Sequence, residues 1–94
     1  MFITYDPAKR AETLAMRDLD MQDAGLVFEG SVITIADTRQ DYGEARLVSV
    51  GFLRGRMVWV VWTSRDETRR IISMRKANDR EIARFGPALA LGTR

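Results

Sequence analysis

The feature that most constrains the fold is a pair of long apolar runs, residues 44–53 and 56–65, separated only by Arg54-Gly55. A two-residue break that contains glycine predicts a tight β-hairpin, because glycine adopts the positive φ angles that such turns require. The middle of the second run, Val58 to Trp62, is apolar at every position and therefore on both faces of a strand. We therefore expect two central strands that are covered on each side.

Shorter patterns flank the hairpin. Asp6-Pro7 predicts a helix start, since the carboxylate accepts an unpaired amide proton and proline lacks one, and Asn78 with Glu81 three residues later predicts another. The other expected elements are strands at 2–5, 31–36 and 69–74, helices at 7–17 and 20–29, a loop at 37–43 and an end of the last helix at Gly86-Pro87. Consecutive strands with helices gathered on them predict the α+β class: an antiparallel central sheet with two N-terminal helices and a C-terminal helix.

The length of the chain predicts a single domain. Its 94 residues suit one modest hydrophobic core, and we assign the domain to residues 1–87. Residues 88–94 show no pattern beyond their apolar side chains. We expect this tail to be disordered or to pack on a partner.

Two missing residue types limit the chemistry. The sequence contains no cysteine and no histidine, which excludes disulfides, thiolate metal ligands and imidazole as a ligand, base or acid. The N-terminus lacks the pattern of a secretory signal, and no apolar run has the length of a membrane span. We expect a cytoplasmic protein that does not bind a membrane.

The formal charge of +2 is unevenly distributed. Residues 1–53 carry five basic and nine acidic side chains, net −4, whereas residues 54–94 carry ten basic and four acidic ones, net +6. Guanidinium and ammonium groups are densest at 70–81, and at this density they favour phosphate over a neutral ligand. The segment therefore predicts a polyanionic ligand, with RNA as the leading candidate.

These patterns resemble those of one known family. Asp6-Pro7-Ala8-Lys9 opens the first helix, and the block from Arg70 to Ala77 is followed by Arg80-Glu81. At these positions the chain resembles the BrnT family of type II toxins, over about residues 2–85. The other matching positions are Ala24, Val27-Phe28, Asp41-Tyr42-Gly43-Glu44, Arg46, Gly51 and Phe85.

The resemblance implies a RelE/ParE-like fold, a ribonuclease activity that halts translation, and a cognate antitoxin with a ribbon-helix-helix domain. The complex would repress its own promoter, so operator DNA would be bound only through the antitoxin. The chain departs from the family pattern at Thr13, Arg17-Asp18 and Met21, where members typically have Asn, His-Gly and Phe. The lost histidine affects activity only if that residue is catalytic in the family.

Cleavage of RNA without a metal ion needs a base for the 2′-hydroxyl, charge stabilisation at phosphorus and a proton for the 5′-oxygen. Without histidine, a carboxylate or a lysine with a lowered pKa must move the protons, and arginine can only stabilise charge. Glu44 and Arg46 would share one strand face, and Arg75 ends the last strand. We predict catalytic roles for Glu44, as the base, and for Arg46, Arg75 and Arg80, and RNA-binding roles for Lys9, Arg65, Arg70 and Lys76.

Structural roles compete with these functional ones. Glu44 with Arg46 also fits an exposed charge pair, and Arg80 with Arg84 fits a solvated helix face. Glu81 also fits a helix cap without further function. The alternative function is a catalytically inert domain that binds its partner and acts as a co-repressor within a DNA-binding complex.

Two further sets of residues have structural explanations. Trp59 and Trp62 lie on opposite faces of one strand, so at least one belongs to the core, while an exposed one could stack on a base. Asp37, Asp41 and Glu44 have a spacing that fits no metal-binding loop. We therefore expect neither a cofactor nor a metal site.

Overall fold

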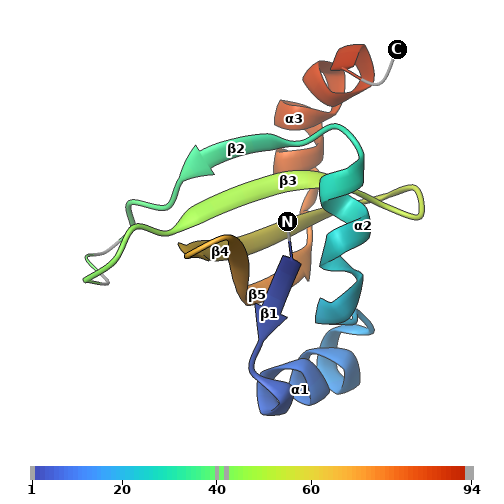
Figure 1. Cartoon of the computed structure of the whole chain (residues 1–94). Helices are drawn as coiled ribbons and strands as arrows, with labels where there is room; N and C mark the ends of the chain where they lie inside the picture. The colour runs from blue at the N-terminus through green and yellow to red at the C-terminus, as the bar shows by residue number, and fades with distance from the viewer. Residues whose placement is uncertain (1, 40, 42, 93–94) are drawn as a thin grey trace.

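A computed structural model describes residues 2–39, 41 and 43–92 (Figure 1). Tyr42 of the family motif and residues 93–94 of the expected tail lie outside the described residues. No helix in the described part of the chain is long and apolar enough to cross a membrane. The elements in chain order are β1 (Phe2–Tyr5), α1 (Pro7–Arg17), the 3-10 helix η1 (Met21–Asp23), α2 (Ala24–Glu29), β2 (Ile33–Ala36), β3 (Leu47–Leu53), β4 (Arg56–Arg65), β5 (Thr68–Lys76) and α3 (Asp79–Gly92).

The strands form a mixed sheet in the order β1-β5-β4-β3-β2. β2, β3, β4 and β5 pair antiparallel with one another, but β1 lies parallel to β5, with Thr4 opposite Arg70. The prediction of an antiparallel sheet is therefore wrong at β1. The segment from α1 to α2 separates β1 from β2, so these strands cannot form a hairpin, and β1 instead pairs with the open edge of the last strand.

β3 and β4 form the predicted hairpin. Leu53 lies opposite Arg56, and the turn residues Arg54 and Gly55 have positive φ angles of 48° and 82°. Positive φ at both central positions gives the turn a twist that matches the twist of the strands. Both strands are central in the sheet, as their apolar middles predicted.

Helices cover both faces of the sheet (Figure 1). On the face under α2, Val27 packs in one apolar cluster with Trp62, whose ring centroid lies 5.7 Å from that of Phe28. On the opposite face, Phe85 of α3 packs in a second cluster and lies 6.0 Å, centroid to centroid, from Trp59. The two tryptophans therefore belong to the packing of the two opposite faces.

Gly51 lets the segment between α2 and β2 pass directly over β3. A Cβ atom at this position would lie 2.9 Å from a methyl carbon of both Val27 and Val32, and 3.2 Å from the carbonyl oxygen of Ser31. Real Cβ atoms essentially never make contacts as short as the first two, so any larger residue would push this segment away from the sheet.

The C-terminal helix is longer than predicted. α3 contains Pro87 and continues to Gly92, so the prediction that it ends at Gly86-Pro87 is wrong. Proline inside a helix costs about 3 kcal/mol through a lost hydrogen bond and a steric clash. Leu89, 1% exposed, packs in the same cluster as Phe85, and its burial offsets part of this cost. The domain boundary predicted at residue 87 falls inside α3.

The segment before β3 is not a regular strand. β3 begins at Leu47, so the expectation that Glu44 and Arg46 share a strand face is wrong. Thr63 of β4 fixes this segment instead, because its hydroxyl donates a hydrogen bond to the carbonyl oxygen of Ala45 at 2.7 Å. The bond holds the chain beside the sheet without the alternation that a strand would impose.

Candidate functional site

A hollow of about 310 Å³ opens where the start of α1 meets one end of the sheet. It contains four cations and two carboxylates from four separate segments of the chain. We refer to it as the basic pocket. Its lining residues are Asp6, Lys9, Glu44, Arg46, Arg65, Arg70 and Ile72.

The parallel pairing of β1 with β5 builds one wall of this pocket. Because Thr4 lies opposite Arg70, the helix that follows β1 starts beside β5, and Lys9 in its first turn lines the same hollow as Arg70. The segment before β3 contributes Glu44 and Arg46 from another side. The strand pairing that the sequence did not predict is therefore what gathers these residues.

The two carboxylates of the pocket differ in how firmly they are held. Asp6 caps α1, since its Oδ1 accepts a hydrogen bond from the amide of Ala8 at 2.9 Å. Glu44 forms an ion pair with Arg65, 3.1 Å between Oε2 and Nη2, and the two side chains are 34% and 57% exposed. Exposed pairs of this kind contribute less than about 1 kcal/mol, so Glu44 can turn toward a ligand at little cost.

Two of the pocket's cations are available to an anion. The side chains of Lys9, which is exposed, and Arg70, which is half-buried, make no ion pair with any described residue. Guanidinium groups bind phosphate oxygens in pairs, and ammonium groups bind them as point charges. The pocket therefore has the donors that a phosphodiester needs.

Arg75 lies elsewhere, where β5 leads into α3. Its guanidinium donates to Glu81 twice, Nη1 to Oε1 at 2.7 Å and Nη2 to Oε2 at 2.8 Å, and lies 4.7 Å from the ring centroid of Trp59. Glu81 also accepts the amide of Asn78 at 2.9 Å, while Asn78 Oδ1 accepts the amide of Glu81 at 2.8 Å. This reciprocal pair is the predicted helix cap. We refer to these four residues as the Arg75 junction.

The Arg75 junction is electrostatically satisfied. The hydrogen bonds from Arg75 hold the pKa of the Glu81 carboxyl below its ordinary value, although partial burial acts in the opposite direction, and the amide of Asn78 adds to the lowering. Glu81 therefore stays ionised and neutralises the guanidinium beside it. Binding a phosphate at Arg75 would require breaking two short hydrogen bonds.

The predicted catalytic cluster is not assembled as one site. Arg80 is exposed in the first turn of α3, and Lys76 lines a different hollow together with Arg75 and the end of α1. Along β5, Arg75 is five residues beyond Arg70, roughly 16 Å at about 3.3 Å per residue. The structure gathers Glu44, Arg46, Lys9, Arg65 and Arg70 in the basic pocket and places Arg75, Arg80 and Lys76 outside it, while the functional role of each residue stays a prediction.

Sequence reasoning missed two residues that line the pocket. The pattern around Asp6 indicated a helix cap, which the structure confirms, but its place beside Arg70 depends on the pairing of β1 with β5. Ile72 gave no signal, because an isoleucine in a strand is ordinary.

Several other carboxylates are neutralised by arginine. Arg10 lies 2.7 Å from Asp20 and, together with the amide of Gln22, lowers the pKa of Asp20 to about 2. Arg39 lies 2.8 Å from Asp37 and lowers its pKa as well. Among the residues that the structure describes, no three acidic side chains lie close enough together to hold a metal ion.

α1 ends with Arg17 and is capped by Asp18. Nη1 of Arg17 donates to the carbonyl oxygen of Met74 at 3.0 Å, on the part of β5 that extends beyond its pairing with β1. Asp18 ends the helix in the left-handed conformation, φ 55°, and its amide donates to Leu14. Arg17 therefore provides a hydrogen-bond donor for the Met74 carbonyl oxygen at the sheet edge. Asp18 has a left-handed backbone conformation that glycine adopts more easily.

Comparison with known proteins identifies a matching family model. The chain matches the family model described as ribonuclease toxin, BrnT, of type II toxin-antitoxin system over residues 5–81 of its 94. The matched region contains both the basic pocket and the Arg75 junction, and no curated protein matches the chain. A toxin of this type implies an antitoxin partner, and a ribonuclease acts on RNA. Because the match covers most of the chain, this protein belongs to the BrnT family of ribonuclease toxins of type II toxin–antitoxin systems.

Proposed function

We propose that the basic pocket is the RNA-cleaving site of an endoribonuclease that needs no metal ion and that blocks translation. The supporting observation is the set of four cations from α1, the segment before β3, β4 and β5 around one open hollow that also holds Glu44. Cations placed around a reacting phosphodiester stabilise the charge that develops in the transition state.

Each residue of the pocket has a proposed role. Glu44 removes the proton of the 2′-hydroxyl, whose oxygen then attacks the neighbouring phosphorus. Arg46 and Arg70 stabilise the negative charge of the phosphorane, and the ammonium group of Lys9 donates a proton to the departing 5′-oxygen. Arg65 orients Glu44 through their ion pair before RNA binds. The products are a 2′,3′-cyclic phosphate and a free 5′-hydroxyl.

We further propose that the protein acts in the cytoplasm and has a RelE/ParE-like fold. Its partner would be an antitoxin that carries a ribbon-helix-helix domain. The complex binds operator DNA through the antitoxin alone. Family membership and the mixed sheet with helices on both faces support this part of the proposal.

The direct test is RNA cleavage by the purified protein with and without EDTA. We expect the same rate in both conditions. Arg46→Ala removes one charge-stabilising donor and should lower the rate on the order of 100-fold, equivalent to about 3 kcal/mol. Arg84→Ala, which removes an exposed arginine of α3, should leave the rate unchanged.

The translation block is tested separately. Wild-type protein added to a cell-free translation reaction should stop protein synthesis, and Arg46→Ala should not. Cleavage that requires added Mg²⁺ would contradict metal independence. If the wild-type protein neither cleaves RNA nor stops translation, the inert co-repressor is the correct alternative.

A further inference from the structure

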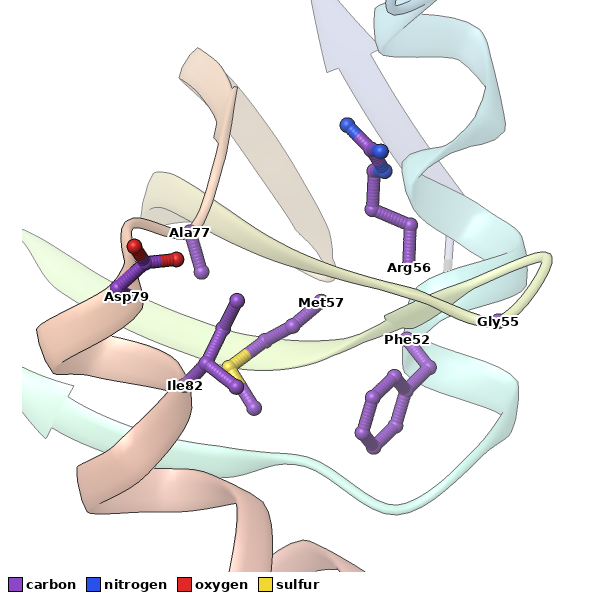
Figure 2. Close-up of a pocket in the computed structure, with 7 residues that line it drawn as sticks. All are labelled: Phe52, Gly55, Arg56, Met57, Ala77, Asp79 and Ile82. Atoms are coloured by element: carbon purple, nitrogen blue, oxygen red, sulfur yellow. The ribbon is translucent and has the colours of Figure 1, made fainter.

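A second hollow, of about 350 Å³, lies at the other end of the strands, between the hairpin turn and the start of α3. Figure 2 shows Phe52 and Ile82 at two sides of this hollow, with Met57 between them. We refer to it as the apolar groove. Its lining residues are Phe52, Gly55, Arg56, Met57, Ala77, Asp79 and Ile82.

Apolar side chains along one face of β3 and one face of α3 extend from the core to this groove. Along β3, Val50 is 0% exposed, but Phe52, the next residue on the same face, is 38% exposed. Along α3, Phe85 is 5% exposed, but Ile82, one turn earlier, is 46% exposed. On both elements, apolar side chains therefore continue from the hydrophobic core to the surface of the described chain. Partly exposed apolar side chains that gather around one hollow are typical of surfaces that bind a partner.

Part of the backbone around the groove is already hydrogen-bonded within the described chain. Phe52 lies opposite Met57 in the hairpin, and the carbonyl oxygen of Met57 accepts the amide of Ala77 at 3.0 Å. On the other side, the amide of Ile82 donates to Asn78 within the turn that starts α3. These bonds use backbone groups of β4 and of the start of α3. The groove itself offers the apolar side chains of Phe52, Met57 and Ile82, and an amphipathic helix binds such a groove through its own apolar side chains.

Cations lie at the end of the sheet next to the groove. Arg56 lines the groove, but its guanidinium points away from Phe52 and Ile82 (Figure 2). It also lines an adjoining hollow that contains Arg54, Lys76 and the carboxylate of Asp18. Arg54 pairs with Asp23 at 3.2 Å, but neither Arg56 nor Lys76 makes an ion pair with a described residue. A segment that fills the groove and crosses this end of the sheet would therefore be attracted by carboxylates of its own.

We infer that the apolar groove is the docking site of the antitoxin, which inserts the apolar face of an amphipathic helix and places flanking carboxylates against Arg56 and Lys76. The inference rests on the toxin–antitoxin pairing within the proposed function and adds where the partner is anchored. Because the groove and the basic pocket lie at opposite ends of the strands, anchoring and inhibition use different parts of the antitoxin.

The test measures binding of the full-length protein to the small protein encoded next to its gene, by titration calorimetry. Phe52→Ser and Ile82→Ser should each weaken binding at least about tenfold, because each removes a central apolar contact. The matched control is Leu26→Ser on α2, since Leu26 is 45% exposed but lies outside the groove. Arg56→Glu should weaken binding and make the affinity less dependent on salt.

RNA cleavage by the same variants separates this inference from the proposed catalysis. We expect Phe52→Ser and Ile82→Ser to cleave RNA like the wild type, which also shows that they fold. The inference is wrong if both variants bind like the wild type, if the wild type forms no complex, or if the variants lose cleavage while they keep their affinity for the partner. If the wild type does not cleave RNA but Ile82→Ser loses binding and keeps its melting temperature, the docking site stands and the proposed catalysis fails.

Discussion

The basic pocket and the Arg75 junction look alike in the sequence and differ in the structure. Each places an arginine of β5 near a glutamate, Arg70 near Glu44 and Arg75 near Glu81. Arg75 forms two short hydrogen bonds to a carboxylate that is 14% exposed, whereas Arg70 faces an open hollow. The number of cations in a segment therefore does not by itself predict a phosphate site, because a guanidinium already bound to a carboxylate must first break those hydrogen bonds. What matters is whether a carboxylate already neutralises the cations.

The largest expected effect is on the rate of RNA cleavage, and the two arginines of β5 test it. Arg70→Ala should lower the rate of RNA cleavage on the order of 100-fold with little change in stability, because it removes a donor to the transition state from a pocket wall. Arg75→Ala should leave most of the cleavage rate and lower the melting temperature instead, because it removes both hydrogen bonds to Glu81. Cleavage rates and thermal melts of the two variants are measured side by side.

The same experiment tests the catalytic role first predicted for Arg75. If Arg75→Ala loses as much activity as Arg70→Ala and melts like the wild type, the two regions form one site and the comparison is mistaken. Arg80→Ala is the control on the neighbouring helix, since this arginine is exposed in the first turn of α3.

A smaller effect is expected at the carboxylate of the junction. Glu81→Gln keeps the shape of the side chain but removes the charge that binds Arg75, and it weakens the reciprocal cap with Asn78. The loss should be about 1–2 kcal/mol of unfolding free energy, measured by urea denaturation. Glu44→Gln is the matched change in the basic pocket and should cost less stability, because its ion pair is exposed.

Acid should act on the same carboxylate with a still smaller effect, since protonated Glu81 can keep one hydrogen bond. The folded-state pKa of Glu81 lies below its ordinary value of 4.5. Its contribution to stability is therefore complete above that value and is lost as the pH falls through the lowered pKa. Between about pH 6 and about pH 3, the urea midpoint should fall less in Glu81→Gln than in the wild type. Equal falls would mean that other carboxylates, such as Asp20, dominate.

The sequence predicted those parts of the fold that depend on local patterns. The hairpin at Arg54-Gly55, the cap at Asp6 and the reciprocal cap of Asn78 with Glu81 follow from short-range chemistry, and the structure contains all three. The parallel pairing of β1 was missed because the two strands are far apart in the sequence. A pairing at such a distance cannot be predicted from the spacing of nearby residues. The continuation of α3 through Pro87 was missed because tertiary burial overrides a local stop signal.

The candidate site was predictable as a set of residue types and not as an arrangement. Every cation of the basic pocket was among the predicted site residues, but the prediction joined Glu44 to Arg75 by assuming regular strands. Strand alternation fails where the chain leaves the sheet, as it does before Leu47. Arg75 is paired because the side chain of Glu81 points toward it, and a sequence does not give the direction of a side chain.

The salt dependence of RNA affinity tests the same comparison at two lysines, one in each region. Lys9 lines the basic pocket, and Lys76 lines another hollow beside Arg75. Lys9→Ala should reduce the slope of the logarithm of RNA affinity against the logarithm of salt concentration by about 0.7, the value for one lost contact to single-stranded nucleic acid. Lys76→Ala should leave the slope unchanged. Equal changes in both variants would mean that RNA extends over both regions.

The smallest effect is expected beside the Arg75 junction, at Asp18. This residue has a φ angle of 55° and an acidic side chain at the C-terminal end of α1, so both its conformation and its charge oppose the structure. Asp18→Gly should raise the free energy of unfolding by about 0.5 kcal/mol, because the gain in the left-handed conformation exceeds the entropy of a more flexible unfolded chain. Asp18→Asn removes only the charge and should gain less. A loss of stability in both variants would show that the carboxylate of Asp18 holds the cations around it, so that this end of the sheet, like the Arg75 junction, depends on charge pairing.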